Sequence, residues 1–113
     1  MNEHLRSLIA ELRILGREKN IRLWERVADD LERPSRNRRS VNIYVIDQYT
    51  RDGETALVPG KVLSVGELSK KLTVAAFQFS NEAKEKINEI GKAITIQQLV
   101  KDNPAGKNVR IIG

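Results

Sequence analysis

The chain has 113 residues, a length that suits one domain with one hydrophobic core. Twenty lysines and arginines outnumber fifteen acidic residues, so the net charge is +5, and charged residues at 31% beside apolar ones at 40% are typical of a folded, non-membrane chain. The absence of cysteine excludes disulfides and thiolate metal sites, and the single histidine, His4, excludes a two-histidine site. No apolar run reaches the length of a membrane span and no signal-peptide pattern is present, which predicts a cytoplasmic protein with polyanionic partners.

Two amphipathic helices are predicted in the first third of the chain. Apolar residues recur every three or four positions in residues 2–16 and again in residues 21–32, the spacing of helices that bury one face. Asn2 is the predicted N-cap of the first helix, and Gly16 is its predicted end. Pro34 ends the second helix because it disfavours helical backbone at the residue before it.

The segment after the second helix holds four arginines within seven positions, with no acidic residue and no apolar anchor. It cannot bury itself, so we predict a surface loop over residues 33–40. Residues 41–49 fit two structures. Their β-branched and aromatic content favours a strand, whereas the spacing of Ile43, Ile46 and Tyr49 favours a short helix, which we prefer.

From residue 55 onward, strand and helix patterns alternate. The predicted strands cover residues 55–58, 72–79, 93–95 and 109–112. Pro59-Gly60 is expected to turn the chain after the first strand, and residues 61–71 to form an ordered loop or irregular strand. The nearly continuous apolar run 72–79 is typical of a central strand covered on both faces.

Two further helices lie between these strands. The first follows a cap at Ser80 or Asn81, stops at Gly91 and buries Ala83, Ile87 and Ile90, whereas the second begins at a capping box of Thr95 and Gln98 and ends at Asn103-Pro104. Such alternation predicts parallel βαβ connections. We therefore expect a single α/β (α+β) domain over 1–113, with a mainly helical part, 1–50, packed with a small parallel or mixed sheet in 51–113.

The basic residues of the loops are the candidate binding site. Guanidinium groups stay charged and bind phosphate through two parallel hydrogen bonds, so an arginine-rich loop suits a polyanion. A second basic group follows Pro59, where Gly60 and Gly66 could let a ligand approach the backbone, and a third, weaker group surrounds Gly106. The predicted RNA-binding residues are Arg33, Arg36, Arg38, Arg39, Lys61, Lys70, Lys71, Lys107 and Arg110.

Other classes of function fit less well. The glycines after Pro59 lack the spacing of a phosphate-binding or dinucleotide-binding loop, and no catalytic set stands out, so no enzyme, cofactor, metal or small-molecule substrate is predicted. Two successive helices with a short turn leave a helix-turn-helix DNA-binding domain as the alternative. Tyr44 and Tyr49 are most simply core or half-buried residues, with base stacking as a minor option.

The segment VPGKVL at 58–63, the segment GELSKKLTV at 66–74, and the matching residues Phe79-Ser80 and 83–87 carry a family resemblance. The chain resembles the family of archaeal L-eighteen-e and bacterial L-fifteen large-subunit ribosomal proteins over essentially its whole length. It departs from the pattern at Ser64 and at Gly91-Lys92, where we expect glycines. The resemblance implies an α/β structural protein that binds large-subunit ribosomal RNA and neighbouring ribosomal proteins.

Overall fold

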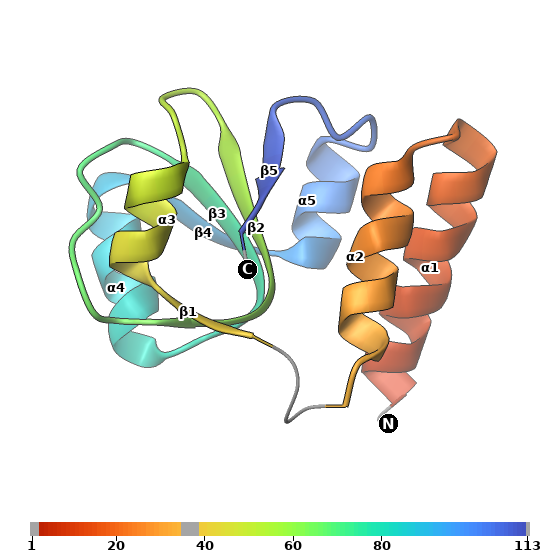
Figure 1. Cartoon of the computed structure of the whole chain (residues 1–113), viewed down its shortest axis with the longest axis horizontal. Helices are drawn as coiled ribbons and strands as arrows, with labels where there is room; N and C mark the ends of the chain where they lie inside the picture. Colours follow the sequence, from red (N-terminus) through yellow and green to blue (C-terminus); the bar gives the residue numbers. More distant parts are fainter. Residues whose placement is uncertain (1–2, 35–38, 113) are drawn as a thin grey trace.

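The computed structural model describes residues 3–34 and 39–112. Within these residues, helices and strands alternate along most of the chain (Figure 1). The elements are α1 (Glu3–Lys19), α2 (Arg22–Glu32), β1 (Ser40–Asn42), α3 (Ile43–Tyr49), β2 (Thr55–Leu63), β3 (Thr73–Phe79), α4 (Asn81–Ile90), β4 (Lys92–Thr95), α5 (Ile96–Asp102) and β5 (Val109–Ile111). The predicted cap Asn2 lies outside the described residues.

The strands form one sheet in the order β1-β2-β3-β4, and β5 also pairs with β2. Every strand pair in the described chain is parallel. β5 and β1 share one edge of β2, because β5 pairs with Thr55–Leu57 and β1 pairs with Lys61–Leu63. The predicted α/β class and parallel connections are confirmed.

Helices cover both faces of this sheet (Figure 1). One hydrophobic cluster joins α1, α2 and α5 to Leu57 and Ala75, and the other joins α3 and α4 to Ala56, Val74 and Ala76. Neighbouring residues of β2 and β3 point to opposite faces, so the two clusters alternate along each strand. The prediction that 72–79 forms a strand buried on both faces is confirmed.

The first helix is longer than its sequence predicts. Gly16 does not end α1 but lies buried inside it, close to α2. A Cβ atom at this position would sit 2.7 Å from Cγ of Glu25 on α2. The glycine therefore serves the close approach of two helices. Asn20, with φ of 54°, takes the left-handed conformation that follows the helix end. The prediction for Pro34 is confirmed, since Arg33 is extended and ends α2.

The prediction that Pro59-Gly60 turns the chain is wrong. β2 runs through both residues, and its pairing with β3 shifts register between Val58 and Lys61. A bulge of this kind accommodates a proline inside a strand. Residues 41–49 contain both predicted structures, a strand and then a helix. Ile90 is 43% exposed and not buried as expected.

The later helix caps agree with the sequence except at one side chain. The Ser80 hydroxyl accepts from the Ala83 amide at 3.2 Å, and the Thr95 hydroxyl accepts from the Gln98 amide at 3.1 Å. The side chain of Gln98 does not return to Thr95 but donates to Asp102 at 3.0 Å. The box is therefore half formed, because a carboxylate one turn further along competes for the amide.

The two N-terminal helices do not favour the DNA-binding alternative. α1 and α2 run side by side in opposite directions and pack together against the sheet (Figure 1), whereas the helices of a helix-turn-helix cross steeply. The face of α2 that carries Trp24, Val27 and Leu31 is buried in the core. In the ranges 3–34 and 39–112, no helix combines the length and the apolar character needed to cross a bilayer.

Candidate nucleic-acid interface

Arg39 and Lys61 meet at the end of β2 that leads into the 64–72 loop. β1 pairs with β2 so that Ser40 faces Lys61, and the Lys61 amide donates to the Arg39 carbonyl at 3.1 Å. Both side chains are exposed, and neither forms an ion pair with any residue in the described ranges. The sheet therefore fixes the backbone of two neighbouring cations while leaving their charges available.

Gly60 makes this juxtaposition possible. A Cβ atom at Gly60 would lie 2.1 Å from the Arg39 carbonyl oxygen and 3.1 Å from its carbonyl carbon. Only glycine leaves room for the Arg39 backbone there. Gly66, with φ of 101°, likewise fits closely against Tyr44. The expectation that these glycines admit a ligand is therefore replaced by a role in packing their own chain.

The remaining arginines of the 33–40 loop are placed only in part. Arg33 is exposed at the end of α2, with Nη2 3.7 Å from the Asp30 carboxylate. Arg36 and Arg38 lie outside the described residues. Their part in RNA binding therefore stays a prediction from the sequence.

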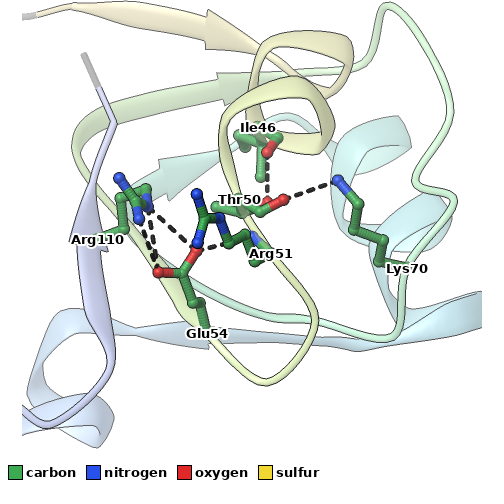
Figure 2. Close-up of polar contacts among 6 residues, drawn as sticks. All are labelled: Ile46, Thr50, Arg51, Glu54, Lys70 and Arg110. Carbon is green, nitrogen blue, oxygen red and sulfur yellow. Dashed lines mark hydrogen bonds and ion pairs between the residues drawn. The ribbon is translucent and has the colours of Figure 1, made fainter.

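Lys70 has a different environment from the one its sequence suggests. Its Nζ donates to the carbonyl of Thr50 at 2.7 Å (Figure 2) and also to the carbonyl of Asp47, at the end of α3. Its neighbour Lys71 is exposed and has no such partner among the described residues. A cation at the C-terminal end of a helix satisfies carbonyls that lack helical partners. These hydrogen bonds give Lys70 a primarily structural role.

We expect Lys70→Met to lower the free energy of unfolding by about 1–2 kcal/mol, because two carbonyls lose a charged donor. The salt dependence of RNA binding should stay unchanged. Urea unfolding and an RNA titration measure the two quantities, and Lys71→Met, which removes the same charge from an exposed position, should stay within about 0.5 kcal/mol of wild type. A wild-type stability combined with a shallower salt dependence would return Lys70 to the binding surface.

Arg110 is held by a carboxylate. Its Nε and Nη2 donate to Glu54, with distances of 3.1 Å and 2.9 Å to the two carboxylate oxygens (Figure 2). The hydrogen bond from Arg110, followed by one from the Arg51 backbone amide, lowers the pKa of Glu54, and the same contact raises the pKa of Arg110. Arg110 is therefore oriented and partly neutralised.

The predicted basic residues occupy two ends of the sheet. Lys61 pairs with Gln78 near the end of β3, whereas Lys71 precedes Thr73, which pairs with Thr55 at the start of β2. Lys107 is exposed in the loop before β5 and lies beside that same starting end, because the Thr55 amide donates to the Asn108 carbonyl at 2.8 Å. The structure thus brings the backbones of Arg39 and Lys61 together and separates these two residues from Lys70, Lys71 and Lys107.

One groove joins residues that the sequence analysis treated separately. It lies between α3 and β5 and has a volume of about 370 Å³. Its lining residues are Arg39, Val45, Tyr49, Arg110, Ile111 and Ile112. Tyr49 is 60% exposed, so the expectation that it is a core or half-buried residue is wrong. Tyr49 continues the three-residue spacing of the buried residues Ile43 and Ile46 in α3, so the sequence pattern did not indicate this exposure.

Comparisons with known proteins give the family. A family described as ribosomal protein 60S L18 and 50S L18e matches residues 1–113. The large ribosomal subunit protein eL18 of Haloarcula marismortui is 43% identical over 111 residues, covering 98% of this chain and 96% of that protein. The eL18 protein of Methanoregula boonei is 44% identical over 112 residues, covering 98% and 93%. The chain belongs to the family of ribosomal proteins 60S L18 and 50S L18e.

Proposed function

We propose that this chain binds large-subunit ribosomal RNA through its basic loops and stabilises the folding of that RNA during subunit assembly, in support of translation. The relatives are named large ribosomal subunit proteins. The chain is accordingly a structural protein of the ribosome and not an enzyme. Its place of action is the cytoplasmic ribosome.

The paired cations Arg39 and Lys61 carry the RNA-binding part of the proposal. Their backbones are joined by a hydrogen bond of 3.1 Å and their side chains are exposed. Phosphates that bind such cations release condensed counterions, which favours binding and makes it depend on salt. A rigid sheet beneath the charges fixes the spacing at which phosphates can be held, which suits the irregular surface of a folded RNA.

Neighbouring ribosomal proteins are the second class of partner that we propose. Tyr44 is 50% exposed and Val65 is 60% exposed, and the two are joined because the Tyr44 amide donates to the Val65 carbonyl at 3.1 Å. These apolar side chains stand on α3 and on the loop that covers it. Exposed apolar surface of this kind supports contact with another protein.

Sedimentation of the native protein tests the proposal. We expect it to migrate with the large subunit in a sucrose gradient, to stay bound through a low-salt wash and to be released as salt rises, because phosphate contacts weaken with ionic strength. Immunodetection across the gradient measures this. Recovery of the protein only at the top of the gradient, in cells with intact large subunits, would contradict the proposal.

A further inference from the structure

The groove between α3 and β5 combines an apolar floor with a charged rim. Val45 and Ile112 supply aliphatic surface, while Arg39, just before β1, and Arg110 of β5 reach it. A ligand that fills it must therefore offer a flat or apolar part and an anionic part. An acidic small molecule, a peptide carboxylate and a nucleotide all have these two parts. The side chain of the groove that is not yet described favours one of these three ligands.

That side chain is Tyr49, the last residue of α3. It is 60% exposed, and it forms no hydrogen bond or ring contact with the described residues. An exposed aromatic ring beside aliphatic residues offers a stacking surface for a base, and it loses little conformational entropy when a base covers it.

The two arginines are suited to the phosphate of the same nucleotide. Arg39 has no ion-pair partner in the described part of the chain, so no carboxylate there competes for its guanidinium. Arg110 uses Nε and Nη2 on Glu54, which leaves Nη1 without a partner among described residues. Glu54 lines the neighbouring groove on the other side of β5 and not this one. Its carboxylate therefore orients Arg110 from outside the groove beside α3.

We propose that this groove binds a single unpaired nucleotide of RNA. The base stacks on the Tyr49 ring over the aliphatic floor, and Arg39 and Arg110 hold its phosphate. The inference rests on the proposed RNA binding and adds to it a specific form of ligand, a base displaced from a helix. A fully paired duplex keeps its bases stacked inside and cannot supply one.

A bulged RNA duplex provides the test. The probe carries one unpaired 2-aminopurine, and the comparison RNA is the same duplex without the bulge. We expect the wild-type protein to prefer the bulged RNA and to quench its fluorescence, as stacking does. Tyr49→Leu should weaken binding of the bulged RNA roughly tenfold and leave binding of the paired duplex unchanged, whereas Tyr49→Phe should retain the preference.

Ile14→Ala is the control, because Ile14 is an apolar residue of α1 that is 56% exposed and does not line the groove. It should bind both RNAs as wild type does. Equal binding of both RNAs by wild type and Tyr49→Leu, with intact binding of deproteinised large-subunit RNA, would overturn this inference alone. If Tyr49→Leu bound all these RNAs as wild type does, but large subunits that carry it lacked a neighbouring ribosomal protein, the groove would be identified as a protein contact instead. Failure of wild type to bind any of these RNAs would overturn the proposed function as well.

Discussion

The triple variant Arg36→Ala, Arg38→Ala and Arg39→Ala is expected to bind deproteinised large-subunit RNA roughly a hundredfold more weakly, at about 1 kcal/mol for each lost phosphate contact. The plot of log affinity against log salt should become shallower by about two to three, because each phosphate contact contributes about 0.7–0.9 to that slope. Titrations at several salt concentrations measure both quantities.

Folding should survive this change. The contact that Arg39 makes with Lys61 uses backbone atoms, with an N–O distance of 3.1 Å, so it does not depend on the arginine side chain. Circular dichroism and urea unfolding check this directly. An unchanged affinity and slope in a folded variant would remove the arginine loop from the interface.

A second triple variant separates local contacts from net charge. Arg6, Arg17 and Arg22 are exposed on α1 and α2 and have no ion-pair partner among the residues that the structure describes. Their replacement by alanine removes the same charge from a different surface. We expect a much smaller change in slope, because exposed charges farther than a Debye length of about 8 Å act weakly at physiological salt. Equal effects of the two variants would mean that total charge alone controls binding.

Gly60→Ala is expected to lower the free energy of unfolding by about 2–3 kcal/mol and to weaken RNA binding at the same time. The added Cβ would lie 2.1 Å from the Arg39 carbonyl oxygen, and backbone atoms cannot move aside as a flexible side chain can. β1 must therefore separate from β2, which moves Arg39 away from Lys61. Urea unfolding gives the stability, and hydrogen exchange at the Lys61 amide reports the broken contact.

Gly53→Ala is the control for the glycine substitution itself. Gly53 has φ of 86° but nothing within 4 Å of an added Cβ, so alanine there meets strain without a collision. We expect a loss of about 1–2 kcal/mol, with the Lys61 amide still protected and RNA binding unchanged. If Gly60→Ala retained both protection and affinity, the close approach of β1 would not position the interface.

The glycines and lysines of residues 60–71 illustrate the limits of sequence reasoning. Gly60, Gly66 and Lys70 have the composition of a ligand-binding segment, yet each contacts its own chain: Gly60 the Arg39 backbone, Gly66 Tyr44, and Lys70 the end of α3. Short-range patterns contain no information about these partners, which lie about twenty residues away in the chain. In the sequence, Lys61 and Lys70 are equivalent lysines of one basic segment. They differ in the residues that the folded chain places beside their side chains.

Local patterns were sufficient for much of the architecture, because they act through neighbours in the chain. The spacing of apolar residues predicted two N-terminal helices, the run 72–79 predicted a buried strand, and the cap expected at Ser80 or Asn81 predicted the start of α4. The excess of basic residues in loops predicted a polyanionic partner. These features depend on periodicity, capping and net charge, which the order of residues alone contains.

Tertiary packing decided the rest. It extended β2 through Pro59 by a register shift, kept Gly16 inside α1 against α2, and exposed Tyr49 beside Arg39, just before β1, and Arg110 of β5. Each outcome depends on which distant segments approach within a few ångströms. Whether a cation stays available for a partner is therefore decided by the contacts of the folded chain and not by its neighbours in sequence.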